Sequence, residues 1–406
     1  MQKKYKLSVY LLLSLSVVLI GMNMRAPVTT LPLMLNQIAA SLHVATSQLG
    51  ILTTIPLVMF VLVSNFAAKT MQLMGLKRAM AFAVAMILLG SLCRVVTNMP
   101  MMLIGTVLIG LGIAHLNVFM PSFVMAFFPT QIGLYTSIYT MSNMLGTAVF
   151  NILTAPVMIN FGWHAMMWIL VLLPALALVV WIVASRFAEP AVQEPVDDID
   201  QSTTKEPKLY VWRNSRAWAL LLVFGFQAIL NYTFVAWMPS LMAYHHVSAA
   251  NIGWIMALYS VMGMFVSLLV PNLIVRLSKR GLAGCVVFMG MIGLLTAYML
   301  FNQNTSSVGF WLTVALMIGS LTAFFFLIAM TMFAAKTTTP FQTATVSGMA
   351  QSGGYLISAF GPTLYGQAFQ ANPTGNAQNI MYTIIVILLV AITLFVIKSD
   401  EIFTKS

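Results

Sequence analysis

The chain has 406 residues, of which 60% are hydrophobic and only 7% are charged. Soluble proteins carry about 25% charged residues, so most of this chain must have lipid as its solvent. The net charge of +11 does not indicate a nucleic-acid partner, because the basic residues lie in short clusters between long apolar runs. We therefore expect a multi-pass protein of the cell membrane, surrounded by lipid.

Twelve apolar stretches are long enough to cross a bilayer, which takes about 20 residues. In chain order they are 7–39, 47–68, 79–98, 100–125, 131–158, 164–186, 216–243, 249–274, 282–301, 307–334, 341–369 and 379–397. The run at the N-terminus has no small-residue cleavage site after it, so it is interpreted as the first span rather than a signal peptide. The sequence predicts an all-α membrane protein with twelve transmembrane helices.

The basic residues test this count. If the N-terminus is cytoplasmic, all of them except Arg25 and Arg94 fall in loops or ends on the cytoplasmic side. The positive-inside rule then predicts that both termini are cytoplasmic. Arg94 is expected in an outer loop, and Arg25 lies within the first apolar stretch. The histidines 43, 164, 245 and 246 lie at outer loop ends and are expected to be solvated.

A polar stretch divides the spans six and six. Residues 187–215 hold most of the acidic side chains, together with three prolines, and are predicted to be a solvated cytoplasmic linker. The expected domains are an N-terminal six-helix bundle over 1–186 and a C-terminal one over 216–406.

The two halves repeat each other. His43-Val44 followed by Gln48-Leu49-Gly50 recurs 203 residues later as His246-Val247 followed by Asn251-Ile252-Gly253. Tyr139, Asn143 and Gly146 recur 208 residues later as Ser347, Gln351 and Gly354. Two homologous six-helix halves are typical of transporters, so the bundles are predicted to be pseudo-symmetric.

Several motifs carry a family resemblance. They are Asn23-Met24-Arg25-Ala26-Pro27, Leu52-Thr53-Thr54-Ile55-Pro56, Gly112-Ile113-Ala114 with Asn117-Val118 and Pro121, Gly133-Leu134-Tyr135-Thr136, Tyr232 with Trp237 and Pro239, and Ser347 to Leu356 followed by Gly361-Pro362. With these the chain resembles the major facilitator superfamily, and within it the cyanate and nitroimidazole transporters. The resemblance implies the major facilitator fold and alternating access to a central site between two rocking bundles.

At three places the sequence differs from patterns of the superfamily, and these differences argue against classical drug efflux. Gln72 stands where the superfamily usually has an aspartate in the loop after the second span. Thr106 stands where proton-linked drug exporters typically carry an arginine, and the fifth span lacks the Gly-Pro signature of those antiporters.

No predicted span contains a carboxylate, because all eight acidic residues lie in the linker or the C-terminal tail. Proton- and sodium-driven carriers commonly use intramembrane carboxylates. A coupled proton would therefore need His115, the substrate or water. Facilitated diffusion or exchange stays open beside proton coupling.

Arg25 is the charge well inside an apolar run. An arginine at the membrane centre costs about 2.5–3.5 kcal/mol on insertion scales, so it normally faces a wet cavity. An anionic or strongly dipolar substrate would be a natural counterpart, because arginine stays charged and offers planar donors. The alternative is an arginine that reaches the outer interface with its side chain.

Further candidate substrate contacts lie in the predicted fourth, fifth, seventh and eleventh spans. They are His115 and Asn117; Tyr139 and Asn143; Gln227, Asn231, Tyr232 and Trp237; and Gln351 and Tyr355. The alternative for the polar groups is hydrogen bonding between helices, worth about 0.6 kcal/mol per pair. For Trp237 it is ordinary packing or the interfacial aromatic belt, and for His115 a structural role.

We therefore predict a transporter, acting as a monomer, that moves a small anion or compact polar solute, similar to cyanate or a nitroimidazole. A proton-linked multidrug exporter and, less so, a membrane solute sensor are the alternatives. An enzyme is not expected, because no nucleophile, acid pair or metal-ligand cluster faces the site. No catalytic residue, metal or cofactor is assigned.

Overall fold

The computed structural model describes residues 7–44, 49–191 and 210–403, and all regular elements in these ranges are helices. They are α1 Leu7–Asn23, α2 Ala26–Thr29, η1 Leu31–Met34, α3 Leu35–Leu42, α4 Ile51–Met74, α5 Leu76–Val95, α6 Met99–Phe127, α7 Ile132–Phe187, η3 Val211–Arg213, α8 Ser215–Tyr244, α9 Ala249–Arg276, α10 Lys279–Phe301, α11 Val308–Ala335, α12 Pro340–Ser358, α13 Phe360–Ala371 and α14 Asn376–Lys398. Within these ranges, ten helical segments are long and apolar enough to cross a membrane.

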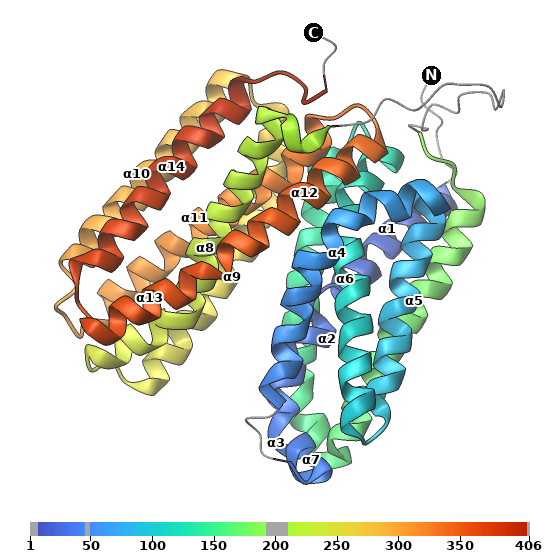
Figure 1. The fold of residues 1–406 in the computed structure, drawn as a ribbon, viewed down its shortest axis with the longest axis horizontal. Helices are drawn as coiled ribbons and strands as arrows, with labels where there is room; N and C mark the ends of the chain where they lie inside the picture. Colours follow the sequence, from blue (N-terminus) through green and yellow to red (C-terminus); the bar gives the residue numbers. More distant parts are fainter. Residues whose placement is uncertain (1–6, 45–48, 192–209, 404–406) are drawn as a thin grey trace. The chain divides into compact units, whose positions relative to one another are not determined.

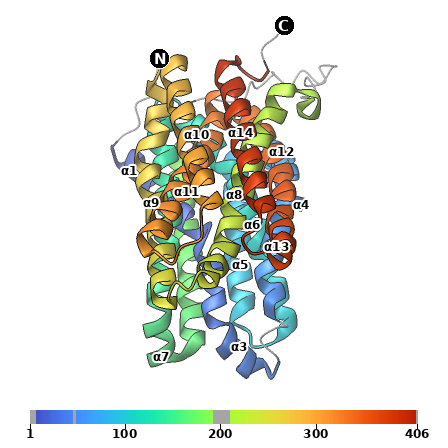
Figure 2. The same cartoon turned by 90° about the vertical axis from the view of Figure 1, so that its left-hand side faces the viewer.

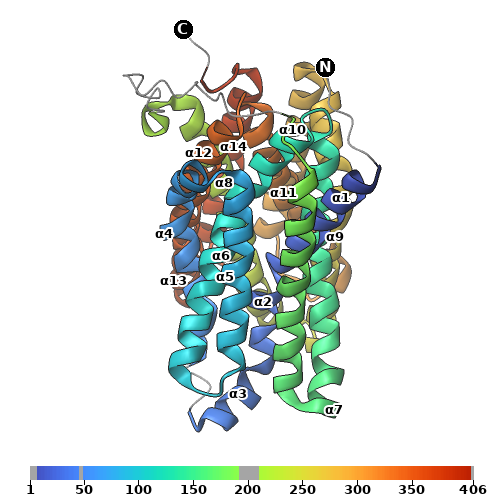
Figure 3. The ribbon, with the colours of Figure 1, turned by 90° about the vertical axis from the view of Figure 1, so that its right-hand side faces the viewer.

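Two of the twelve predicted spans are not among these ten segments. The first, predicted over 131–158, belongs to α7, which is a helical hairpin rather than one straight helix. Gly162 has φ 79° and ψ 168°, a backbone conformation that glycine adopts without steric cost. The two arms therefore run side by side and meet at the end labelled α7 (Figure 3). They correspond to the predicted spans 131–158 and 164–186.

The other such span, predicted over 341–369, consists of α12 and α13. The two helices follow each other end to end, with Ala359 between them (Figure 1). This segment is rich in Gly, Ser, Thr and Gln, which explains why it is less apolar than the other spans.

The chain forms two compact units. The first comprises 1–209 together with 338–348, and the second comprises 210–337 together with 349–406. In the first unit α5 packs along α6, and in the second α10 packs along α14 (Figure 2). The linker predicted over 187–215 stays a prediction, because residues 192–209 lie outside the described residues.

The internal repeat is visible in the backbone. In the described parts of the chain, His43 and His246 are the two non-glycine residues with positive φ, at 54° and 60°. Each lies just beyond a helix C-terminus, and the valine after it donates its N–H to the carbonyl five residues back, at 3.1 Å for Val44 and 3.0 Å for Val247. These are the histidines that the sequence repeat aligns, so both halves end this helix in the same way.

The second repeated motif brings helices into close contact in each unit. A Cβ built on Gly146 of α7 would lie 2.7 Å from the carbonyl oxygen of Met22 in α1. A Cβ on Gly354 of α12 would lie 3.2 Å from the backbone nitrogen of Gly225 in α8. Small residues at such crossings let membrane helices approach closely, so the repeat preserves a packing contact.

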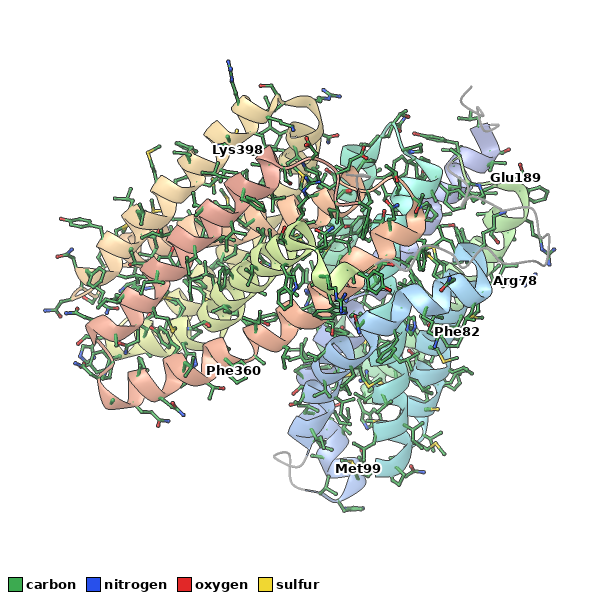
Figure 4. The ribbon with its side chains drawn as sticks, turned by 45° about the horizontal axis from the view of Figure 1, so that its top comes forward. Arg78, Phe82, Met99, Glu189, Phe360 and Lys398 are labelled. Atoms are coloured by element: carbon green, nitrogen blue, oxygen red, sulfur yellow. The ribbon has the colours of Figure 1, made fainter. Side chains whose placement is uncertain are left out.

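Basic side chains gather at one end of each unit. In the first, Lys77 Nζ donates to the carbonyl of Ser185 at 2.9 Å. In the second, Lys279 Nζ lies 3.4 Å from Asp400 Oδ1, and Lys336 Nζ donates to the carbonyl of Ser399, just after Lys398 ends α14 (Figure 4). The loops that carry the positive charge thus share one end in each unit, as the positive-inside pattern requires.

Candidate functional site

The first span is broken at Arg25. The sequence predicted an unbroken apolar run over 7–39, but α1 ends at Asn23 and α2 begins at Ala26. Pro27 and Pro32 cause the interruption, because each lacks the N–H that would bond the carbonyl four residues earlier. Arg25 is half-buried, and its carbonyl accepts the backbone N–H groups of Val28 and Thr29 at 2.9 and 3.0 Å.

Arg94 corrects one prediction. It was expected in an outer loop, but its side chain is 2% exposed and lies in the last turn of α5. Its Nη1 donates to the carbonyl of Pro27 at 2.7 Å, while Nε and Nη2 donate to Thr106 Oγ1 at 3.1 and 2.9 Å. The Thr106 position, where drug exporters typically carry an arginine, thus receives a guanidinium from the neighbouring helix.

This contact also fixes the depth of the break. Thr106 lies seven residues after the start of α6 at Met99, or about 10 Å along the helix at 1.5 Å per residue. Because Arg94 bonds both Thr106 and Pro27, Pro27 lies at about the same depth as Thr106. Arg25 therefore lies deeper than the first turns of α6, which favours an interior position over the outer interface.

The fifth-span candidates lie on the first arm of α7, against α1. Tyr139 is 3% exposed, and its hydroxyl has no hydrogen-bond partner among the described residues. Asn143 is half-buried one turn further on. A Cβ on Gly21 of α1 would lie 2.9 Å from the carbonyl oxygen of Tyr139, so this arm and the first span are in backbone contact just before the break.

His115 is engaged by its neighbours. Its Nδ1 lies 2.9 Å from the carbonyl of Leu111, which can only accept, so Nδ1 carries the hydrogen. Nε2 lies 3.2 Å from Thr70 Oγ1, and the rings of His115 and Phe82 pack at nearly right angles, with 5.8 Å between their centroids. Asn117, two residues further along α6, is half-buried.

An aromatic cluster in the second unit joins α8 to α12. The ring of Tyr355 packs edge-to-face on Phe224 at 5.1 Å between centroids and lies 6.5 Å from the ring of Tyr232. Gln351, one turn before Tyr355, is fully buried. The structure thus brings together Tyr232 and Tyr355 on two adjoining helices, while Gln351 lies deeper in the packing of α12.

The polar pair of the seventh span differs in its surroundings. Gln227 is 4% exposed. The side-chain oxygen of Asn231, one turn later, accepts a 2.6 Å hydrogen bond from the hydroxyl of Tyr259 in α9. Sequence reasoning missed Tyr259, because a tyrosine in an apolar helix gives no sign of its partner.

Trp237 contacts the start of α13. Its Nε1 donates to the carbonyl of Pro362 at 2.8 Å, and its ring packs against Phe369 at 5.3 Å. It also lines a cavity together with Tyr365 and Tyr382. The indole hydrogen is therefore already used inside the second unit.

His245 corrects another prediction. It was expected to be solvated, but it is 7% exposed and its ring packs on Trp311 at 5.3 Å between centroids. Burial, together with the nearby charge of His246, lowers the pKa of His245.

Several of these features are typical of a solute carrier: the break of the first span, the buried arginine and the polar faces of α7, α8 and α12. A comparison with protein families identifies the family of the chain. A family model described as Major Facilitator Superfamily matches residues 13–362. The chain belongs to the Major Facilitator Superfamily. It is a multi-pass membrane transporter rather than an enzyme, and the predicted all-α fold of this superfamily is confirmed.

Three relatives match much of the chain. The uncharacterized transporter YycB of Bacillus subtilis (strain 168) is 29% identical over 378 residues, covering 92% of this chain and 89% of the relative. The 2-nitroimidazole transporter of Escherichia coli (strain K12) is 28% identical, covering 88% of both chains. The cyanate transport protein CynX of the same organism is 25% identical, covering 69% of this chain and 71% of that protein.

Solved structures share the fold at low sequence identity. The proton:xylose symporter XylE has a TM-score of 0.73 and 11% identity, covering 96% of this chain and 94% of that chain. The Escherichia coli fucose:proton symporter FucP has a TM-score of 0.71 and 14% identity, covering 97% of this chain and 99% of that chain. These similarities concern the fold alone and do not indicate the substrate of this chain.

Proposed function

We propose that this transporter moves a small anion or a compact, strongly dipolar solute, of the cyanate or nitroimidazole class, by alternating access. The observation that carries the proposal is the position of Arg25. It stands at the break of the first span, below the outer turns of α6, in a chain whose predicted spans contain no acidic residue.

Charge balance supports an anion or a dipole. Arg25 and the buried Arg94 lie close to the same turn of the first span, and both remain charged at neutral pH. With no carboxylate in the spans, this part of the first unit has an excess of positive charge. In a medium of low dielectric constant such an excess attracts a negative group strongly. The two relatives named for cyanate and 2-nitroimidazole fit this expectation.

The second unit, taken by itself, holds aromatic and amide side chains that we propose as solute contacts. The proposed contacts there are Tyr232 and Tyr355, whose ring centroids lie 6.5 Å apart, and Gln351, one turn before Tyr355 on α12. Such groups suit a flat solute that needs both stacking and hydrogen bonds. Further proposed contacts are Asn117, Tyr139 and Asn143 in the first unit and Gln227 in the second.

Three of the predicted substrate contacts already have hydrogen-bond partners in the structure, and we assign them other roles. The hydrogens of the His115 and Trp237 rings face backbone carbonyls, and the side-chain oxygen of Asn231 is bonded to Tyr259. We assign His115 and Trp237 to the support of the site. The amide nitrogen of Asn231 is proposed to face the solute.

The proposal includes the cell membrane as location, cytoplasmic termini and a monomeric transporter. The clustering of basic loops at one end of each unit supports the orientation. A reporter fused to the C-terminus that proved to be extracellular would contradict it.

The experiment is solute flux into liposomes that contain the purified protein. Radiolabelled cyanate and 2-nitroimidazole are the probes, each measured with and without a pH gradient. We expect saturable uptake of at least one probe and counterflow when the lumen is preloaded with the same solute. Uptake only of large hydrophobic cations, driven by the pH gradient, would overturn the proposal and favour a multidrug exporter. Binding without flux would favour a sensor.

A further inference from the structure

Arg94 is a buried charge that is not among the proposed solute contacts. It lies one residue before the end of α5 at Val95, yet its side chain is 2% exposed. Three hydrogen bonds of its guanidinium go to two neighbouring helices of the same unit, to the Pro27 carbonyl in α2 and to the Thr106 hydroxyl in α6. Arg94 therefore joins the first, third and fourth spans at one point.

The surroundings of Arg94 provide space for its side chain and an acceptor for its guanidinium. A Cβ on Gly105 would lie 2.9 Å from Arg94 Cγ and 2.5 Å from the carbonyl oxygen of Gly90, so a side chain there would displace the arginine stem. The Thr106 hydroxyl donates to the Met102 carbonyl at 2.6 Å, which turns its lone pairs toward the guanidinium. The last turn of a helix also favours a positive charge, because of the exposed carbonyl groups there.

The turn that Arg94 holds lacks regular helical bonds. Pro27 cannot donate to the carbonyl of Asn23, and Pro32 cannot donate to the carbonyl of Val28. On one side the Arg25 carbonyl accepts hydrogen bonds from the N–H groups of Val28 and Thr29. On the other side Arg94 fixes the carbonyl of Pro27, two residues from Arg25.

We propose that Arg94 is a positioning residue that clamps the broken turn of the first span and thereby holds Arg25 in place for the solute. This inference rests on the proposed function only for the role of Arg25. Arginine suits the task because its planar fork reaches a carbonyl and a hydroxyl at once, which a lysine ammonium does with much less directional constraint.

The first test is hydrogen exchange in the full-length protein, in lipid nanodiscs, which needs no ligand. In Arg94→Gln the amides of residues 24–31 should exchange roughly tenfold faster than in the wild type, because the turn opens locally. Thr106→Val, which keeps the charge and the volume, should give a smaller acceleration in the same segment. Arg78→Gln removes an exposed charge from the other end of α5 and should leave this segment unchanged.

The second test separates positioning from mere packing by transport kinetics with the cyanate probe. Thr106→Val and Arg94→Gln should raise KM, by about threefold and tenfold, with the maximal rate per folded protein within about twofold. In an Arg25→Gln background, Arg94→Gln should raise KM no further, because both changes act through one side chain.

The outcomes are distinguishable. Unchanged exchange over 24–31 in both variants would overturn the clamp. Faster exchange with an unchanged KM, or an additive effect in the Arg25→Gln background, would overturn the positioning role. If wild-type liposomes carry neither cyanate nor 2-nitroimidazole, the proposed solute is wrong, while the exchange experiment still decides whether Arg94 holds the turn.

Discussion

The indole nitrogen of Trp237 donates a hydrogen bond to the carbonyl oxygen of Pro362, at 2.8 Å. Pro362 lies near the start of α13, where the eleventh span is interrupted at Ala359. The first unit has a comparable bond, from Arg94 to the carbonyl of Pro27. In each unit, a long side chain from another helix thus binds a proline carbonyl beside an interrupted span.

Replacing Trp237 with phenylalanine tests its supporting role. Trp237→Phe keeps most of the ring contact with Phe369 but removes the bond to Pro362, so we expect a loss of about 0.6–1.5 kcal/mol in the free energy of unfolding. Thermal unfolding in detergent measures the loss, and KM for the transported solute should stay within twofold. A large rise in KM at unchanged stability would instead make Trp237 a substrate contact.

The glycine contact between α5 and α6 gives a second prediction. Gly105→Ala places a methyl group 2.5 Å from the carbonyl oxygen of Gly90 and beside Arg94, so the two helices must separate. We expect a destabilisation of about 1–3 kcal/mol, seen as a lower midpoint of thermal unfolding.

The matched control is Gly253→Ala in α9, where nothing lies within 4 Å of the new methyl group. This change should be neutral or stabilising, by up to about 1 kcal/mol, because alanine favours the helix over glycine. Equal effects of the two substitutions would contradict the close contact of α5 with α6.

Asn214 links the start of α8 to the C-terminal segment. Its side-chain oxygen accepts the backbone N–H groups of Arg216 and Ala217, and its Nδ2 donates to the carbonyl of Ile402 at 2.7 Å. Asn214→Ala loses both functions and should cost about 2 kcal/mol. Asn214→Asp keeps the helix cap, so it should lose only about half as much in the same unfolding assay. An aspartate variant as unstable as the alanine variant would exclude the capping role.

The buried His245 predicts a dependence of stability on pH. Because burial lowers its pKa, the folded state binds the proton less readily than the unfolded state, whose histidine has a pKa of about 6.5. Stability from this group is therefore full above about pH 6.5 and decreases as the pH falls below that value. His245→Phe should remove up to about 1 kcal/mol of the decrease between pH 7.5 and pH 5.5.

The control for this measurement is the exposed His43, which shares the left-handed backbone of the repeat. His43→Asn keeps that backbone accessible, and it should leave the pH profile of the unfolding temperature unchanged. A profile that is the same in wild type and His245→Phe would show that His245 does not contribute.

Hydropathy predicted most of the fold, because a lipid solvent leaves a simple signal of apolar length. The turn at Gly162 fell between two predicted spans, and the repeat around His43 and His246 returned as a shared backbone conformation. The break at Arg25 was missed, because counting apolar residues does not register that Pro27 and Pro32 remove two backbone donors from the same stretch.

The candidate site was less accessible to sequence reasoning. Arg94 looked like a loop residue, since nothing local reveals that Pro27 and Thr106 supply its acceptors. The partner of Asn231 was equally hidden, because Tyr259 is 28 residues away and on another helix. Polar residue types at helical spacing marked the faces of the helices, whereas the partners depend on tertiary packing.

Arg25 is proposed to be the counter-charge of the transported solute. The most direct measurement is the dissociation constant of cyanate for the purified protein, from ligand-dependent thermal stabilisation, in wild type, Arg25→Lys and Arg25→Gln. We expect that Arg25→Gln weakens cyanate binding by at least about 30-fold, that Arg25→Lys weakens it less, and that unfolding without ligand changes little. Equal cyanate affinity in wild type and Arg25→Gln would contradict it.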